Sequence, residues 1–395
     1  MYDVVVVGAG PGGSTAARYL AKLGLSVALI DKDQFPRDKA CGGGFAFGII
    51  NDFPYLRKKA QSFLSGVCEI GVLHSPNRRI VLKGKVNMAT ALRYDFDKAL
   101  FDAAVEEGAE PVLSTRIKSI CVKDDIVSLG TSKDGIIQGK AVIGADGVGS
   151  IVARSLNLHR RWPSNRITAC RVAEVPENSE FISQTFGKEY HFFANVGGLP
   201  GYGWIFPKKN TINIGLGIVG SHAQGLPRYF NRFVQMLKTK NLLRENADLS
   251  SAKGALVPTG GTIAKTFGTR ALLVGDSAGM VSPLTGGGIH YAMKAGRIAA
   301  YVLAQGIDTD RLDVQHLSIY QKLWMNDFGR EINPMLMAQR IFTGPFTNLL
   351  FEIAQRDESL QSVVSEAMAE SSQGIDVKGL LLKTLKVIGR SAFHL

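Results

Sequence analysis

A glycine-rich segment directly after the first apolar stretch constrains the fold of this 395-residue chain most strongly. Residues 2–7 are almost continuously apolar and β-branched, which is typical of a strand buried on both faces of a parallel sheet. Gly8, Gly10 and Gly13 follow in the spacing G-x-G-x-x-G. A helical pattern over 14–23 then leads to a second apolar strand at 26–30. The pattern predicts the strand–helix–strand unit of a doubly wound α/β fold.

Each glycine in this spacing has a physical reason. Gly8 permits a tight turn, Gly10 leaves room for a pyrophosphate, and Gly13 lets the helix and strand pack closely, with the helix N-terminus facing the anion. Asp31 ends the second strand, where its carboxylate can accept hydrogen bonds from an adenosine ribose. The segment therefore predicts a dinucleotide site, and at this point FAD and NAD are both open.

Two further glycine clusters follow apolar strands. The first, over 142–150, reads V-I-G-A-D-G-V-G-S; its Asp146 can contact a cofactor or only cap a turn. The second, over 271–279, reads A-L-L-V-G-D-S-A-G and is followed by three consecutive glycines and an apolar helical pattern. Together with the first segment, these clusters resemble the flavoprotein superfamily of para-hydroxybenzoate hydroxylase. The resemblance implies a Rossmann-like FAD-binding domain in which Asp276 binds the ribityl or ribose part of FAD.

The segment over 199–208, L-P-G-Y-G-W-I-F-P-K, contains closely spaced aromatic residues. In an extended strand Tyr202, Trp204 and Phe206 share one face. With Pro207 they resemble the Y-x-W-x-F-P signature of the geranylgeranyl reductase family. Such an aromatic wall suits a long apolar substrate lying against the flavin, although the same stripe also fits the ordinary core of a sheet.

The segment over 36–45, P-R-D-K-A-C-G-G-G-F, is similar to the cysteine-glycine-glycine segment of that family. Cys41 can donate a proton, shape the cavity or only pack, and the glycines through Gly44 let the backbone pass close to the isoalloxazine or form a flexible turn. Arg93 matches a family position that contacts FAD; a surface arginine at a helix start is the alternative. The cofactor-binding residues that the resemblance implies are Gly8, Gly10, Gly13, Asp31, Cys41, Gly42, Arg93, Asp276, Gly286, Gly287, Gly288 and Ile289.

The family resemblance implies FAD-dependent reduction of isolated double bonds in geranylgeranyl chains, carried by diphosphates, archaeal-type ether lipids, chlorophyll precursors or quinones. An isolated alkene requires a proton at one carbon and a hydride at the other, and aromatic rings stabilise transient cationic character. The candidate catalytic residues are Cys41, Tyr202 and Trp204. The candidate substrate-binding residues are Tyr202, Trp204, Phe206 and Pro207. The alternative function is that of a flavin monooxygenase or halogenase. A third hypothesis is a non-catalytic flavin-binding or lipid-binding protein.

Composition limits the partners of the chain. The net charge of +12 attracts anions, yet no nucleic-acid-binding motif occurs. Four widely separated cysteines indicate neither a metal site nor a disulfide framework, and they fit a reducing cytoplasm. A second dinucleotide unit is not recognisable, so electrons come from a transient donor. We expect an acidic reduced ferredoxin or NADPH.

The sequence predicts three regions. The FAD-binding domain takes 1–60, 91–160 and 258–306; an antiparallel β-sheet substrate domain takes 61–90 and 161–257; and helices take 307–395. Apolar residues over 335–350 line a tunnel or pack as core. A segment over 377–390 has one apolar and one basic face, so it can lie on an anionic membrane or present a solvated face. We expect a cytoplasmic protein with contact to the membrane surface.

Overall fold

Strand β1 (Tyr2–Val7) lies inside the first of two sheets in the computed structural model, which describes residues 1–356. It pairs in parallel with β2 (Val27–Ile30) on one side and with β9 (Ile136–Gly144) on the other. Val4, Val5 and Val6 have no exposed surface. The prediction of a buried parallel strand is therefore confirmed.

The described chain divides into two units. Unit 1 comprises Met1–Asp38, Arg93–Pro163 and Pro258–Ile332; unit 2 comprises Lys39–Leu92, Ser164–Val257 and the described residues from 333 on. The helices after residue 307, which the sequence sets apart as a third region, are thus divided between the two units.

Unit 1 contains a mixed sheet with the strand order β15-β16-β9-β1-β2-β6. A β7–β8 hairpin joins this sheet through an antiparallel pairing of β8 with β9. The further strands are β6 (Glu110–Val112), β7 (Ile117–Lys123), β8 (Ile126–Thr131), β15 (Phe267–Gly268) and β16 (Ala271–Leu273).

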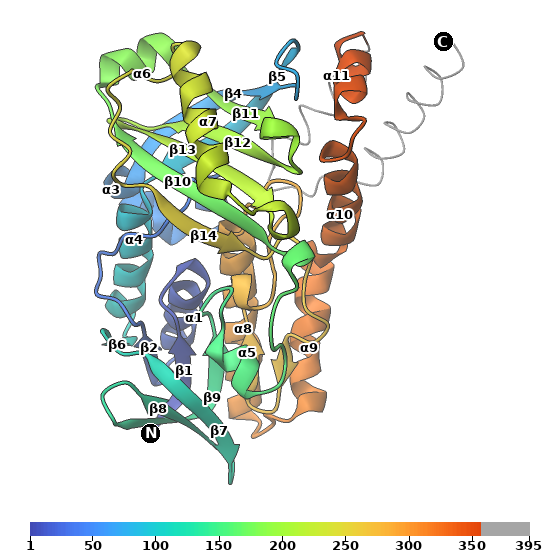
Figure 1. Cartoon of the computed structure of the whole chain (residues 1–395). Helices are drawn as coiled ribbons and strands as arrows, with labels where there is room; N and C mark the ends of the chain where they lie inside the picture. The colour runs from blue at the N-terminus through green and yellow to red at the C-terminus, as the bar shows by residue number, and fades with distance from the viewer. Residues whose placement is uncertain (357–395) are drawn as a thin grey trace. The chain divides into compact units, whose positions relative to one another are not determined.

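The helices of unit 1 pack closely because small residues face each other. A Cβ atom at Gly296 would lie 2.3 Å from the Gly12 carbonyl oxygen, so only glycine permits helices α1 and α8 to approach this closely (Figure 1). The helices are α1 (Pro11–Lys22), α4 (Arg93–Glu106), α5 (Ile151–Ser155), α8 (Ile289–Asp308) and α9 (Val314–Trp324).

Unit 2 contains a sheet with the order β14-β10-β13-β12-β11-β4-β5-β3. Its pairs are antiparallel except β4 with β11, which are parallel. The prediction of an antiparallel sheet is wrong at this one pair, because β11 belongs to a later segment and no tight hairpin joins it to β4. The strands are β3 (Gly44–Ala46), β4 (Leu64–His74), β5 (Val81–Ala91), β10 (Thr168–Pro176), β11 (Glu189–Ala194), β12 (Gly201–Pro207), β13 (Thr211–Val219) and β14 (Lys253–Val257).

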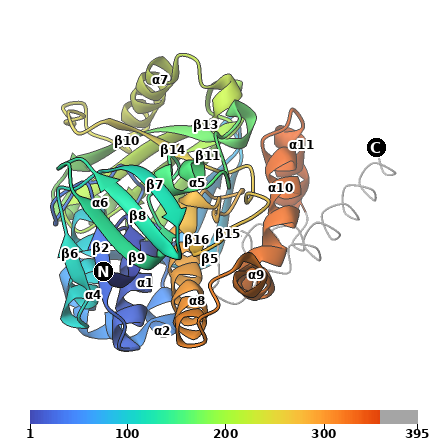
Figure 2. The same cartoon turned by 90° about the horizontal axis from the view of Figure 1, so that it is seen from below.

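One face of this sheet carries aliphatic residues that pack under α6 (Ser179–Phe186) and α7 (Leu226–Thr239). Helix α7 packs against β10 and β13 and lies beside this sheet in Figure 2. Ile205 on β12 and Ile214 on β13 are fully buried on this face, which leaves the alternate residues of both strands for the opposite face. Two short helices, α2 (Ile49–Asp52) and α3 (Ala60–Phe63), complete the early part of unit 2.

The last described helices are α10 (Arg330–Phe342) and α11 (Thr347–Arg356). Phe351 of α11 packs with Ile80 and Leu82 beside β5. Met337 and Phe346 are 53% and 71% exposed, so these two residues do not pack as core, whereas Met335 and Leu350 are buried. The tunnel stays a prediction. The segment over 377–390 lies outside the described residues. Among the described helices, none is both long and apolar enough to span a membrane.

Candidate functional site

The loop between β1 and α1 contains glycines that serve two different purposes. Gly8 has φ of +100°, and a Cβ atom there would lie 2.4 Å from the Ala145 carbonyl oxygen. A Cβ at Gly13 would lie 1.8 Å from the Gly8 carbonyl oxygen, so the fold itself requires both glycines. A Cβ at Gly10 would meet only the Arg37 guanidinium, at 3.7 Å. The described protein leaves space beside Gly10, and this space suits the close approach of a pyrophosphate.

The Asp31 carboxylate anchors this loop. Its Oδ2 accepts a 2.7 Å hydrogen bond from the Ala9 amide, and its Oδ1 accepts a 3.0 Å bond from the Asp33 amide. The side chain is largely buried at the carboxyl end of β2. Because each carboxylate oxygen can accept a second hydrogen bond, Asp31 can hold the loop and also bind a ribose hydroxyl.

Two arginines share one buried carboxylate near the glycine loop. Arg93 begins α4 and donates bonds of 2.6 and 2.7 Å to the two oxygens of Asp97, which has no exposed surface. Arg37 forms a 3.0 Å ion pair with the same carboxylate. Arg93 is only 8% exposed, so the alternative of a surface arginine is wrong.

The Arg37–Asp97–Arg93 cluster fits a bound anion for two reasons. Two guanidinium cations face one carboxylate, which leaves one positive charge uncompensated within the cluster. The Arg37 Nε is buried without a hydrogen-bond partner among the described residues, and such a donor is costly to leave unpaired. Sequence reasoning missed Arg37 and Asp97. The i,i+4 spacing of Arg93 and Asp97 was an available signal for the ion pair.

The late glycine cluster lies at the start of α8. Asp276 occupies a short 3₁₀ turn (Gly275–Ser277), and its Oδ1 would lie 3.3 Å from a Cβ at Gly288, the residue that precedes the helix. Gly286 has φ of +70°, a conformation that favours glycine. No side chain caps α8 or α1 at the N-terminus. The structure thus brings Asp276, Gly286, Gly287, Gly288 and Ile289 together at an uncapped helix N-terminus.

Asp146 has a structural role in the central glycine cluster. Its Oδ1 accepts a 2.6 Å bond from the Ser150 hydroxyl, and its Oδ2 accepts bonds from the Ile151 and Val152 amides at the start of α5. Burial raises the pKa of Asp146, while these hydrogen bonds act in the opposite direction. The interpretation of Asp146 as a capping residue is confirmed.

In unit 2, the face of the sheet opposite α7 carries aromatic rings, and we call it the aromatic face. Tyr202, Trp204 and Phe206 lie on this face together, as the alternation of β12 predicts. The Phe192 ring meets Tyr202 and Phe206 edge-on, with centroids 5.1 and 5.6 Å away. The other members of the face are Cys68, Val86, Met88, Cys170, Val172, Tyr190, Ala255 and Val257.

Glycines make room for the largest rings of the aromatic face. A Cβ at Gly215 on β13 would lie 1.9 Å from the Trp204 ring, so the indole rests directly on the backbone there. A Cβ at Gly42 would lie 2.7 Å from the Phe206 ring, and one at Gly44 would lie 3.1 Å from it. The packing of the cysteine-glycine segment against Phe206 therefore explains these two glycines within unit 2.

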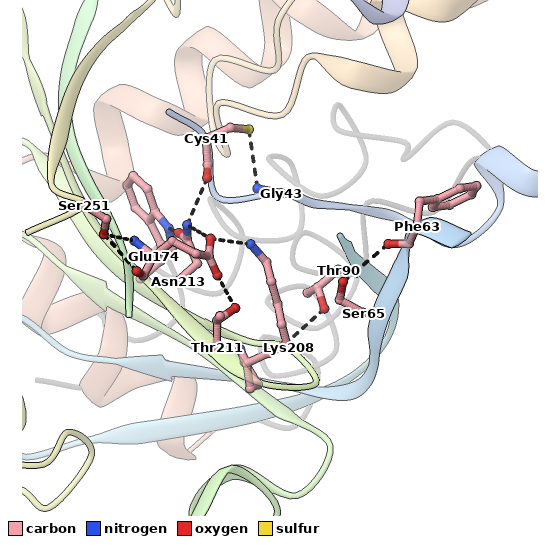
Figure 3. A network of polar contacts seen from close by, with 12 residues as sticks. Cys41, Gly43, Phe63, Ser65, Thr90, Glu174, Lys208, Thr211, Asn213 and Ser251 are labelled. Carbon is pink, nitrogen blue, oxygen red and sulfur yellow. Dashed lines mark hydrogen bonds and ion pairs between the residues drawn. The ribbon is translucent and has the colours of Figure 1, made fainter. Parts of the chain in front are cut away.

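A polar network connects the aromatic face to the Cys41 segment (Figure 3). Asn213 accepts a 2.8 Å bond from the Trp204 indole and donates a 3.0 Å bond to the Cys41 carbonyl oxygen. Asn213 also donates to Glu174, whose carboxylate pairs with Lys208 at 2.7 Å. Sequence reasoning missed Asn213, Glu174 and Lys208. The Pro207 carbonyl oxygen accepts a 3.0 Å bond from the Thr90 hydroxyl.

Three cysteines lie in unit 2, and their surroundings differ. Cys41 is partly exposed, and its Sγ accepts a hydrogen bond from the Gly43 amide at 3.4 Å. Burial raises the pKa of Cys68 to about 12. Burial, with a contribution from Cys41, raises the pKa of Cys170 to about 12. Both buried thiols therefore stay protonated near neutral pH.

The predicted site residues fall into two groups. Unit 1 contains Gly8, Gly10, Gly13, Asp31, Arg93, Asp276, Gly286, Gly287, Gly288 and Ile289. Unit 2 contains Cys41, Gly42, Tyr202, Trp204, Phe206 and Pro207. Among the described residues, no cluster of histidine, cysteine or acidic side chains could hold a metal ion.

A strand–glycine loop–helix unit, a buried acid at the end of β2 and uncapped helix N-termini define a dinucleotide-binding protein. The family model described as "FAD binding domain" matches residues 1–316. The digeranylgeranylglycerophospholipid reductase of Methanocaldococcus jannaschii is 31% identical over 96% of this chain and 93% of its own length. The enzyme of that name from Methanosarcina acetivorans is 32% identical over 98% and 94%.

Solved structures agree with these sequence matches. A geranylgeranyl bacteriochlorophyll reductase-like protein from Thermoplasma acidophilum is 25% identical, with a TM-score of 0.83 over 100% of this chain and 99% of that chain. A halogenase solved with phloroglucinol and FAD is 17% identical, with a TM-score of 0.70 over 96% and 85%, and shows a likeness of fold alone. The chain belongs to the geranylgeranyl reductase family of FAD-dependent proteins. The predicted α/β fold and the FAD cofactor are confirmed.

Proposed function

We propose that this protein is an FAD-dependent reductase that saturates isolated carbon–carbon double bonds of geranylgeranyl chains, with a di-geranylgeranyl glycerophospholipid as its substrate. Geranylgeranyl diphosphate is the competing substrate. The aromatic face, built around Tyr202, Trp204 and Phe206, carries the proposal. Relatives named for this reaction match the chain over almost its whole length, which supports the same choice.

The residues of unit 1 suit FAD. The glycine loop and the Arg37–Asp97–Arg93 cluster offer amides and positive charge to the pyrophosphate, and Asp31 offers a carboxylate to the ribose. The uncapped start of α8 offers a positive helix end to the flavin ring. When bound, FAD supplies the hydride of the reduction.

The aromatic face suits a long hydrocarbon chain. Seven adjacent strands, from β14 to β5, contribute to it, so it is on the order of 30 Å wide. Five residues of β13 alternate onto this face, namely Thr211, Asn213, Gly215, Gly217 and Val219. The two glycines leave the strand with little bulk beneath the Trp204 ring. The rings of Tyr202 and Trp204 stabilise positive charge that develops on the alkene as it is protonated. Cys41, Tyr202 and a bound water are the candidate proton donors.

An anaerobic assay tests the proposed reaction. The holoenzyme is reduced with dithionite and incubated with a di-geranylgeranyl glycerophospholipid or with geranylgeranyl diphosphate. The masses of the products are measured by mass spectrometry. We expect a gain of two hydrogens for each reduced double bond, with the phospholipid preferred. Parallel reactions driven by an acidic reduced ferredoxin or by NADPH identify the electron donor; the net charge of +12 favours the ferredoxin. Oxidation of the reduced protein only by oxygen, with a hydroxylated or halogenated product, would contradict the proposal.

We further propose that the last described helices contact the membrane that holds the substrate. Phe346, in the turn between α10 and α11, is 71% exposed, and Met337 on α10 and Leu349 on α11 are 53% and 42% exposed. Arg340 and Arg356 are exposed on the same two helices. Large apolar side chains together with basic ones favour an anionic lipid surface.

Replacing Phe346 by aspartate tests this contact. We expect F346D to weaken sedimentation with phosphatidylglycerol vesicles by about tenfold, because burial of one large apolar side chain is worth about 1.5–3 kcal/mol. Ile136→Asp is the matched control, because Ile136 is also 71% exposed but lies on β9. Equal binding of F346D, I136D and the unmodified chain to the vesicles would refute the contact. A change of oligomeric state in F346D without weaker vesicle binding would refute it as well.

A further inference from the structure

Asn213 is the residue through which Trp204 and the Cys41 segment are joined. Its side chain is 1% exposed, on the strand that neighbours β12. The orientation of its amide follows from its partners. The Trp204 indole can only donate, so it meets Oδ1; the Cys41 carbonyl oxygen and the Glu174 carboxylate can only accept, so they meet Nδ2. All of these hydrogen bonds agree on one orientation.

Glu174 and Lys208 hold Asn213 in place. Glu174 Oε2 accepts from both Asn213, at 2.8 Å, and Lys208, at 2.7 Å. Lys208 is 3% exposed, so its charge is balanced by Glu174 within the network. The Thr211 hydroxyl donates to the second Glu174 oxygen. A buried amide with its donors and acceptor satisfied has a single favourable position, because each alternative leaves a polar group unpaired.

We propose that Asn213 is a positioning residue that fixes the Cys41 backbone and the Trp204 indole at one distance from each other. This inference rests on the proposed function, because it assigns Asn213 to the reduction of the prenyl chain. The Trp204 indole is trapped between the Gly215 backbone and the Asn213 bond, so its plane cannot turn freely. The Cys41 carbonyl bond fixes the segment that contains this partly exposed cysteine. The alkene and its proton donor therefore meet in one fixed arrangement.

Four variants separate positioning from general stability. Asn213→Leu keeps a similar volume but removes every polar contact, and Asn213→Ser keeps a hydroxyl but is too short to bridge both partners. Trp204→Phe removes the indole hydrogen bond to Asn213 but leaves the Asn213 bond to the Cys41 carbonyl oxygen, and its ring is smaller. Thr211→Val is the matched control. Thr211 donates to Glu174, as Asn213 does, but the Cys41 carbonyl oxygen accepts its hydrogen bond from Asn213.

The first readout needs no substrate. The holoenzyme variants are treated with iodoacetamide below their melting temperatures, and alkylation of each cysteine is followed by peptide mass spectrometry. We expect Cys41 to react about tenfold faster in N213L and N213S. Loss of the hydrogen bond to its carbonyl oxygen lowers the free energy needed to open the segment by roughly 1.4 kcal/mol. T211V and W204F should leave this rate within about twofold. The exposed Cys121 gives an internal reference rate.

The second readout is the reduction itself. We expect N213L and N213S to lower kcat by about 30-fold with KM within about threefold. Loss of the fixed orientation of Trp204 and Cys41 raises the barrier of the reaction more than it weakens substrate binding. The losses of kcat in N213L and W204F should be less than additive in the double variant, since both substitutions remove the same indole hydrogen bond. Unchanged Cys41 alkylation in both Asn213 variants would overturn the inference, and so would equal losses in T211V. If the unmodified enzyme saturates no alkene while alkylation still rises in N213L, the proposed function fails but the link between Asn213 and Cys41 stands.

Discussion

Replacing Gly10 by alanine is expected to weaken FAD binding by about 100-fold, or about 2.7 kcal/mol, while leaving the stability of the apoprotein unchanged. The Gly10 backbone, with φ of −71° and ψ of −175°, is open to alanine. The nearest described atom to the new Cβ is Arg37 Nη2 at 3.7 Å, an ordinary contact. The methyl group would instead occupy the space in which the pyrophosphate approaches the loop. Titration of flavin fluorescence gives the Kd, and thermal unfolding of the apoprotein gives its stability.

Gly13→Ala is the matched variant, with the opposite expectation. Its Cβ would lie 1.8 Å from the Gly8 carbonyl oxygen, so the loop or α1 must move. We expect the apoprotein itself to lose about 1–3 kcal/mol or more, as overpacking does elsewhere. If G10A and G13A destabilised the apoprotein equally, or if G10A bound FAD as tightly as the unmodified chain, Gly10 would not be the site of pyrophosphate approach.

The contrast between these glycines shows how far the sequence alone could lead. Gly8, Gly10 and Gly13 act within one strand–turn–helix unit, where spacing along the chain fixes spacing in the molecule. The face shared by Tyr202, Trp204 and Phe206 followed from alternation in one strand for the same reason. Features that are local in sequence were therefore predictable.

Features that depend on tertiary pairing were not predictable. Arg37 meets Asp97 across 60 residues, and Asn213 meets Cys41 across 172. A single sequence contains no periodic signal for such pairs. The parallel pairing of β4 with β11 has the same origin, since the chain returns to unit 2 only after building part of unit 1. The exposure of Phe346 likewise depends on whether the turn between α10 and α11 finds a packing partner.

Replacing Gly215 by alanine is expected to lower the rate of double-bond reduction by about 100-fold, an increase of about 2.7 kcal/mol in the barrier. The new Cβ would lie 1.9 Å from the Trp204 ring, and three ring atoms fall within 2.4 Å of it. The indole must then leave its place on β13 and break its bond to Asn213. We also expect a loss of stability of about 1–3 kcal/mol from overpacking. Anaerobic product formation and thermal unfolding measure the two effects separately.

Two further variants decide whether the effect arises at the indole. Gly217→Ala changes the same strand and face, but its Cβ would lie 3.7 Å from the Trp204 ring, so activity should stay within about threefold. The Cβ at Gly217 would instead meet Thr168 and Cys170 at 3.1 and 3.2 Å, which small side-chain shifts relieve. In a Trp204→Phe background the smaller ring should accept Gly215→Ala, so the two stability losses should be less than additive. Additive losses, or an equal loss of activity in G217A, would locate the constraint in the β13 backbone rather than in the Trp204 ring.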